Sequence, residues 1–181
     1  MLQLIVPGAE TYNPETNEFS YSDQQVLQLE HSLLSLSKWE SKWCKAFLTK
    51  KEKSAEEIKD YVRCMTINKN VDPTVYDRLT SENYNSINAY ISAKMTATYI
   101  KHPSSEGQVG GDTVTSELIY FWMITYGIPF ECQKWHLNRL LALIDVCRIK
   151  TQPQKKMSRS ALAHRNSSLN AARRAKYHTR G

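Results

Sequence analysis

The strongest structural signal in the sequence predicts a helical hairpin over residues 115–149. These residues read TSELIYFWMITYGIPFECQKWHLNRLLALIDVCRI. Thr115 or Thr113 can cap the first helix, because a threonine hydroxyl accepts hydrogen bonds from the free N–H groups of a first turn. Gly127 is expected to end that helix, since glycine adopts the left-handed conformation without steric cost. Pro129 is expected to open the second helix. The rest of the chain is expected to pack against this hairpin.

Apolar residues recur at helical spacing along both helices of the hairpin. In the first helix, Leu118, Phe121 and Trp122 follow at i, i+3 and i+4, and Ile119, Met123 and Ile124 widen the expected apolar face. The inward stripe of the second helix consists of Leu137, Leu140, Leu141, Ile144 and Cys147. A short corner makes two such helices antiparallel neighbours. The sequence therefore predicts that the two stripes form the largest block of buried apolar side chains.

The N-terminal part of the chain contains three short segments in which polar and apolar residues alternate, a pattern typical of strands. They are residues 1–6 (MLQLIV), 18–21 (EFSY) and 26–31 (VLQLEH). We expect the second segment to pair with the first. The third segment places Leu27 and Leu29 on one face. The sequence thus predicts a small antiparallel sheet near the N-terminus.

Capping patterns predict helices between residues 37 and 91. Residues 37–40 and 54–57 have the spacing of a capping box, so we expect helices from there to about residues 48 and 65. Asp72, followed by a proline, and Thr80 are expected to open two more. Helical spacing predicts that Ile58, Tyr61, Val62 and Met65 face inward and that Tyr84, Ile87 and Ile91 form an apolar stripe. The predicted fold class is α+β, mainly α, with a small N-terminal antiparallel β element packed on a helical bundle.

Less regular segments follow these helices and surround the hairpin. Residues 94–100 alternate and form either another strand or an irregular link. Residues 102–112 are rich in Gly, Ser and Pro, which predicts a loop. Residues 151–153 (TQP) mark a boundary. We therefore expect a mainly helical globular domain over residues 1–150 and a basic C-terminal arm over residues 151–181.

The net charge of +6 is unevenly distributed. Residues 1–147 hold all 18 acidic residues and 14 Lys and Arg, whereas residues 148–181 hold 10 Lys and Arg and no acidic residue. Such an arm can contact nucleic acid phosphates or an acidic protein, or it can be a solvated end. The candidate partner-binding residues of the arm are Lys155, Lys156, Arg159, Arg165, Arg173 and Arg174.

Two tryptophans of the domain are further candidates for partner binding. Trp39 and Trp135 stand beside charged neighbours, whereas Trp43 and Trp122 fit a core position better. Tryptophan at helical spacing is usually buried, but it is also enriched in protein interfaces. The sequence leaves both interpretations open for Trp39 and Trp135.

The sequence contains no motif that indicates catalysis. A G-x-S-x-G motif, a P-loop and a G-x-G-x-x-G motif are all absent. The four cysteines lie in apolar or helical surroundings, so we expect reduced core residues. Cys132 and His136 are four residues apart, which supplies half of a zinc site, but a second pair with suitable spacing is missing. We expect no enzyme, no metal and no cofactor.

Three runs of sequence resemble proteins encoded in the tail-morphogenesis region of long-tailed phages. They are residues 27–47 (LQLEHSLLSLSKWESKWCKAF), 117–147 (ELIYFWMITYGIPFECQKWHLNRLLALIDVC) and 155–181 (KKMSR…RN…LNAARRAKYHTRG). In kind, the chain is most similar to the tail assembly chaperones. The resemblance implies a helical, self-associating, non-enzymatic protein that coats the tape measure protein and helps to recruit tail-tube subunits.

The resemblance also implies a place of action. A tail assembly chaperone works in the host cytoplasm and is absent from the finished particle. The sequence itself predicts neither a signal peptide nor a membrane span. One alternative is a structural virion component, a tail or connector protein whose basic arm binds neighbouring subunits or DNA. Another is a regulator that binds nucleic acid.

Overall fold

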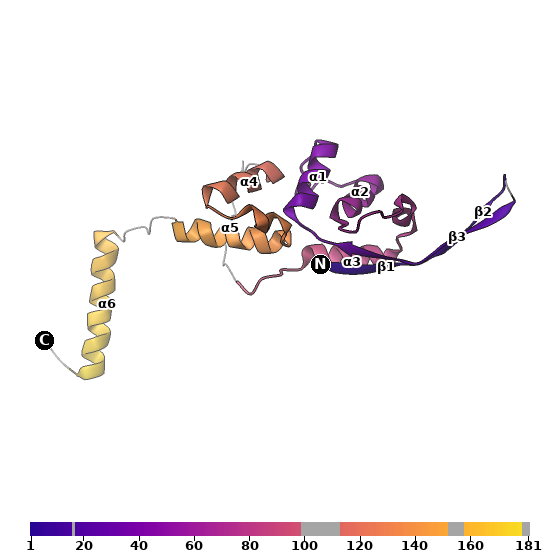
Figure 1. Ribbon diagram of the computed structural model, residues 1–181. Helices are drawn as coiled ribbons and strands as arrows, with labels where there is room; N and C mark the ends of the chain where they lie inside the picture. Colours follow the sequence, from indigo (N-terminus) through magenta and orange to yellow (C-terminus); the bar gives the residue numbers. More distant parts are fainter. Residues whose placement is uncertain (16, 99–112, 152–157, 179–181) are drawn as a thin grey trace. The chain divides into compact units, whose positions relative to one another are not determined.

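The computed structural model describes residues 1–15, 17–98, 113–151 and 158–178 and shows a mainly helical α+β protein (Figure 1). The chain divides into two units, Met1–Ile149 and Lys150–Gly181. The strands are β1 (Leu2–Val6), β2 (Ala9–Asn13), β3 (Glu18–Ser22) and β4 (Gln25–Leu29). The α-helices are α1 (Leu33–Trp43), α2 (Ala55–Met65), α3 (Ser81–Ser92), α4 (Ser116–Thr125), α5 (Leu137–Thr151) and α6 (Arg159–Tyr177), and the 3₁₀ helices are η1 (Pro73–Arg78) and η2 (Phe130–Lys134).

The expected fold class is confirmed, because an antiparallel β element near the N-terminus packs on helices. β1 pairs with β4, and the apolar side chains that the two strands share, Leu4, Val6, Leu27 and Leu29, are buried. The partner predicted for β3 was wrong: β3 pairs with β2 in a second two-stranded sheet. The sequence AETYN of β2 is too polar to have been recognised as a strand.

Gly8 lies between β1 and β2, where the backbone comes very close to the end of β3. A Cβ atom at this position would stand 2.5 Å from the carbonyl oxygen of Ser22. Only glycine fits so close an approach. The β2–β3 pair continues directly from the β1–β4 pair at this point. β2 and β3 extend away from the helices of the unit (Figure 1).

The predicted start of α1 at Ser37 was wrong. Ser32 caps the helix instead: its Oγ accepts from the Ser35 N–H at 3.3 Å, and the Ser35 Oγ accepts from the Ser32 N–H at 2.9 Å. This serine pair forms a capping box of its own, so the Ser37–Glu40 spacing is a coincidental match inside the helix. The helix ends at Trp43, before the predicted end near residue 48, because Cys44 is left-handed with φ 50°.

Other helix ends follow their sequence signals. Ser54 and Glu57 form the predicted capping box of α2. Asp72 caps η1, and Thr80 caps α3. After α3, residues 93–98 form no regular element, and the predicted loop at 102–112 lies outside the described residues.

The hairpin prediction is confirmed at its first helix and corrected at its second. Thr115 caps α4, and Gly127 is left-handed with φ 63°. Pro129, however, opens only the short helix η2, and α5 begins at Leu137. The Leu137 N–H donates to the carbonyl oxygen of His31 at 2.7 Å, which fixes the start of α5 against the end of the first strand pair.

The prediction of which face of α4 is buried was wrong in part. Ile119 and Met123 are fully buried, whereas Phe121 is 60% exposed and Trp122 and Leu118 are half-buried. The α4 sequence is apolar on all sides, so periodicity alone cannot orient the helix. In α5 the expected inward residues Leu137, Leu140 and Ile144 are buried, and Leu141 and Cys147 are half-buried.

Two hydrophobic clusters form the core of the first unit. The first cluster joins β1 and β4 to α2, η1 and α3, and the second joins α4, η2 and α5. Helix α1 contributes to both, with Trp39 in the first cluster and Leu33 and Leu36 in the second. The buried carboxylate of Glu40 accepts from the Phe47 N–H at 2.8 Å and from the Ser116 N–H at 2.7 Å, which ties the loop after α1 to the start of α4.

The described part of the second unit contains the last two residues of α5 and the helix α6. Ser158 caps the helix, with its Oγ accepting from the Ala161 N–H at 3.1 Å. Every described side chain of α6 is exposed. Within the described ranges, neither this helix nor the others combine the length and apolar character needed to cross a membrane.

Candidate functional site

An open apolar groove lies between α2 and α3. Its volume is about 610 Å³. The floor is made of side chains that are nearly inaccessible, Tyr61, Val62 and Ile87. Ile58, 41% exposed, stands on the α2 side, and Ile91 stands half-buried on the α3 side. The groove therefore offers an elongated apolar surface between two helices.

Few polar side chains line the groove. Lys53 and Asn88 are the polar residues among its lining. The Lys53 ammonium lies 4.7 Å from the centroid of the Phe47 ring, so its charge is placed over an aromatic face. An apolar ligand would meet a surface with few groups that need hydrogen bonds.

The α2 wall is held in place by aromatic side chains behind it. The Trp39 indole N–H donates to the carbonyl oxygen of Glu57 at 2.8 Å. Phe47 stacks on Tyr61 with the ring centroids 3.8 Å apart. Lys45 pairs with the Glu57 carboxylate and, together with the Ser54 N–H, holds the pKa of that carboxyl below its usual range. The wall is thus fixed from the protein side and leaves Ile58 free to contact a ligand.

The α3 wall is fixed to the sheet. Asn83, in the first turn of α3, donates from Nδ2 to the carbonyl oxygen of Ile5 at 3.1 Å. At the other end of the helix, Tyr90 donates to a carboxylate oxygen of Glu30 at 2.7 Å. Both walls are anchored independently of any occupant, so the groove is largely preformed.

The structure corrects the interpretation of Trp39 as a candidate partner contact. The side chain is 1% exposed and packs between Trp43, with the two rings stacked 6.2 Å apart, and Phe47. A partner cannot reach it. Trp39 instead supports the α2 wall of the groove, and Trp43, half-buried, donates from its indole to Asp60 at 2.9 Å.

Trp135 is partly accessible. It is half-buried against the second cluster, and the Arg139 guanidinium lies 4.1 Å from the centroid of its ring. This arrangement is a close cation–π contact. Trp135 does not line the groove, so the structure does not bring it together with the apolar surface between α2 and α3.

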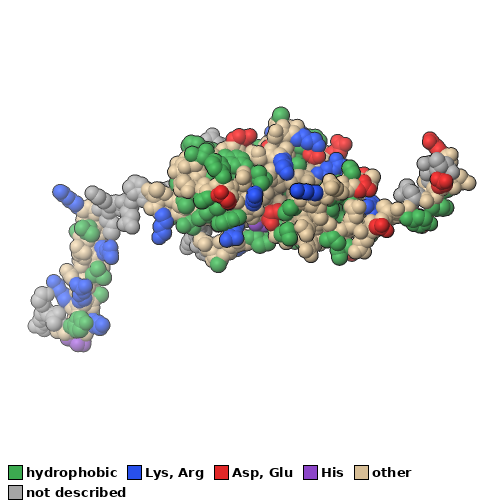
Figure 2. Space-filling model, viewed as in Figure 1, with side chains coloured by type: hydrophobic (Ala, Val, Ile, Leu, Met, Phe, Trp, Pro, Cys, Tyr) green, Lys and Arg blue, Asp and Glu red, His purple; other side chains and the backbone are tan. Residues whose placement is uncertain are grey.

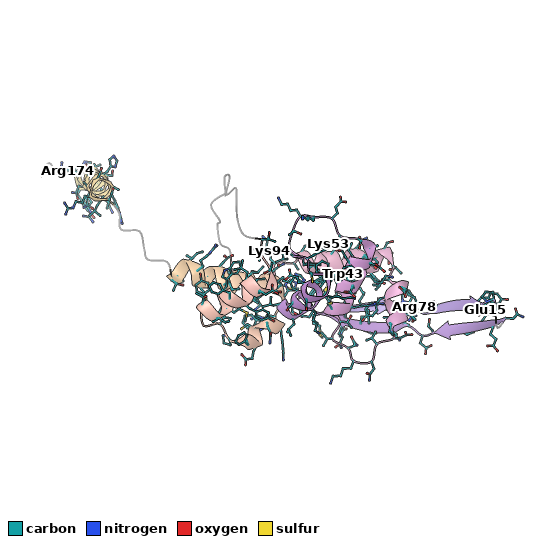
Figure 3. The ribbon with its side chains drawn as sticks, turned by 90° about the horizontal axis from the view of Figure 1, so that it is seen from above. Glu15, Trp43, Lys53, Arg78, Lys94 and Arg174 are labelled. Carbon is teal, nitrogen blue, oxygen red and sulfur yellow. The ribbon has the colours of Figure 1, made fainter. Side chains whose placement is uncertain are left out.

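The basic candidates of the arm are spread over α6 and the segment before it. Arg159, Arg165, Arg173 and Arg174 are exposed on α6, whose side chains radiate around the helix axis in Figure 3. Lys155 and Lys156 lie outside the described residues. The helix gives these arginines a regular spacing.

The Cys132 and His136 pair is not a pair on one helix face. Cys132 is in η2, and His136 lies between η2 and α5, where its Nε2 is 3.0 Å from the carbonyl oxygen of Tyr90. Within the described part of the chain, no group of three His, Cys, Asp or Glu side chains could hold a metal ion. Cys132 is buried as expected, but Cys44 is exposed, which corrects its interpretation as a core residue.

The sequence analysis missed the groove, although it named several residues that line it. Helical spacing predicted that Ile58, Tyr61 and Val62 face inward and that Tyr84, Ile87 and Ile91 form an apolar stripe. That signal identifies an apolar face but cannot show whether another element covers it.

Comparison of the chain with family models, with curated proteins and with solved structures found no match.

Proposed function

We propose that the protein is a non-enzymatic tail assembly chaperone of a long-tailed phage that binds helices of the tape measure protein. The observation that carries this proposal is the groove between α2 and α3, with its floor of Tyr61, Val62 and Ile87. An amphipathic helix binds such a groove by burying one apolar face in it. Long apolar helices that would otherwise aggregate are suitable ligands for this surface.

The basic arm supports a second contact in this proposal. Five Lys and Arg side chains of α6 are exposed and can attract an acidic segment of the tape measure protein or the tail-tube protein. Exposed charges of one sign accelerate encounter with an oppositely charged partner. The chaperone acts in the host cytoplasm and leaves before the particle is complete.

A structural virion component remains the second candidate function. The exposed basic helix favours it, because the same five side chains fit neighbouring subunits or the phosphates of DNA. Quantitative mass spectrometry of purified particles separates the two proposals. The chaperone should be missing from finished particles, whereas a structural component should be present at a fixed copy number.

Two isoleucines of the groove provide a direct mutational test. We expect the double variant Ile58→Gln/Ile91→Gln to bind the tape measure protein about 10–100-fold more weakly, because each side chain loses part of the roughly 1.5–3 kcal/mol of an apolar burial. Glutamine is a good helix former, so α2 and α3 should persist. Isothermal titration with purified tape measure segments measures the dissociation constant.

A matched control uses two exposed apolar residues outside the groove. Phe121 and Ile124 of α4 are 60% and 65% exposed, and Phe121→Gln/Ile124→Gln should bind like the wild type. Equal weakening in both variants would mean that binding is not specific to the groove, and weakening of the α4 variant alone would place the partner on α4.

A further inference from the structure

The β2–β3 hairpin exposes three aromatic rings on one face. Its register pairs Tyr12 with Phe19 and Glu10 with Tyr21, and residues opposite each other in a pair share a face of the sheet. Tyr12, Phe19 and Tyr21 are 47%, 57% and 75% exposed, and the rings of Tyr12 and Phe19 lie 5.0 Å apart. Exposed aromatic side chains gathered in this way are typical of an interaction surface.

The hairpin stands as a separate two-stranded sheet. A pair of strands without a third element is only marginally stable in water. Its base is braced by Arg78, which donates from Nη1 to the carbonyl oxygens of Pro7 at 3.0 Å and Asp23 at 3.2 Å (Figure 3). The brace fixes the direction of the hairpin and leaves its aromatic face to be covered by something else.

The charge of the hairpin restricts what can cover it. Residues 9–23 contain four acidic residues, Glu10, Glu15, Glu18 and Asp23, and no Lys or Arg. Glu10 lies on the aromatic face and accepts a hydrogen bond from the Tyr21 phenol, which raises the pKa of that phenol. A partner of this face should therefore combine positive charge with apolar side chains.

Helix α6 has that combination. It carries five Lys and Arg and no acidic residue. One face holds, at spacings of three and four residues, a mixed apolar and basic stripe of Leu162, Arg165, Leu169, Arg173 and Lys176. Leu162 and Leu169 are 47% and 46% exposed. Figure 2 shows the two opposite compositions: acidic and hydrophobic side chains on the hairpin, basic and hydrophobic ones on α6.

We propose that the aromatic face of the β2–β3 hairpin binds the Leu162–Lys176 stripe of α6 from a second copy of the chain. Arginine side chains can lie over the exposed rings as cation–π partners, and the two leucines can fill the space between the rings. Because the two surfaces differ and every copy has both, the contact is head-to-tail. It closes into a ring or continues into a filament, depending on the rotation between copies.

This proposal does not rest on the groove or on the identity of its ligand. If the test below fails, the proposal that the groove between α2 and α3 binds a helix is unaffected. If the groove binds no helix, the proposed contact between the hairpin and α6 is unaffected. Neither the hairpin nor α6 contributes to the groove lining.

Sedimentation equilibrium of the full chain tests the proposal. At low salt, the average mass should rise with concentration above the 20.9 kDa of one chain. At about 1 M salt, where the screening length is about 3 Å, the association should weaken at least tenfold. Two charge-reversal variants locate the contact: Glu10→Lys on the aromatic face of the hairpin and Arg165→Glu/Arg173→Glu in α6.

Each variant alone should stay monomeric at concentrations where the wild type associates. An equimolar mixture should associate again, because the unchanged α6 of the hairpin variant meets the unchanged hairpin of the α6 variant. None of these three side chains is buried, so far-UV circular dichroism should be the same for all proteins. A third variant, Phe19→Ser, should weaken association without changing the charge.

Three results would overturn the proposal. The wild type could stay monomeric at every concentration at low salt. The mixture of the two variants could stay monomeric, which would show that the hairpin of one chain does not bind α6 of another. The wild type could associate only after a short DNA duplex is added, which would assign α6 to nucleic acid instead.

Discussion

Leu140→Ala is expected to lower the free energy of unfolding by about 2–5 kcal/mol, the range for a leucine that leaves a cavity in a packed core. Leu140 is fully buried in the second cluster, beside Ile119 and Met123 of α4. Its removal takes away apolar contacts that join α4 to α5. Urea unfolding followed by tryptophan fluorescence measures the change.

The same substitution on α6 serves as the control. Leu162 is 47% exposed, and Leu162→Ala should change the free energy of unfolding of the first unit by no more than about 0.5 kcal/mol. Equal stability of the Leu140→Ala variant and the wild type would show that α5 turns another face to the core.

Acidification is expected to destabilise the protein by about 3 kcal/mol through His31 alone. The imidazole is 2% exposed, and burial together with repulsion from His136 lowers its pKa to about 4. His31 Nδ1 is 2.7 Å from the Tyr61 hydroxyl, and the ring centroids of His31 and His136 are 5.2 Å apart. The site therefore favours the neutral imidazole.

The direction of this pH effect follows from the protonation of His31 in the folded and in the unfolded chain. Between an ordinary pKa of about 6.5 and about 4, the unfolded chain binds a proton at His31 and the folded chain does not. The contribution of His31 to the free energy of unfolding is therefore complete above pH 6.5 and is lost progressively as the pH falls to about 4. Urea unfolding at a series of pH values measures it.

The pH dependence of a His31→Gln variant isolates this contribution. Its free energy of unfolding should fall less steeply than that of the wild type between pH 6.5 and 4, whatever its stability at pH 7. Parallel curves for His31→Gln and the wild type would show that the buried imidazole does not titrate differently in the two states.

The local signals of the sequence predicted much of the secondary structure. Ser54, Asp72, Thr80 and Thr115 all cap the helices that they were expected to cap. These predictions succeeded because a cap depends on residues within one turn. The start of α1 was missed for a related reason: its capping box uses two serines, Ser32 and Ser35, rather than a serine and a glutamate.

Features that depend on distant contacts were not predictable in the same way. The buried face of α4 depends on which side meets α1 and α5, and its apolar residues surround the helix. Glu40 resembles an ordinary helical glutamate in the sequence, yet it accepts hydrogen bonds from backbone groups as distant as Ser116. The pairing of β2 with β3 depends on a strand whose own sequence is polar.

The candidate site was predictable only as separate apolar faces. Helical spacing identified the inward residues of α2 and α3 but gave no information on the gap between the two helices. For Trp39, the charged neighbours in the sequence lie on other faces of α1, so they do not indicate exposure. The basic character of the arm follows directly from composition, whereas the shared stripe of Leu162, Arg165 and Leu169 requires the helix.

Methyl NMR during titration tests the groove most directly. With isoleucine methyl groups labelled, an amphipathic helical segment of the tape measure protein is added to the full chain. The account predicts saturable shifts of Ile58, Ile87 and Ile91, which line the groove, and unchanged signals of Ile119 and Ile144 in the second cluster. Saturable binding with shifts at Ile119 and Ile144 and none at the groove residues would contradict it.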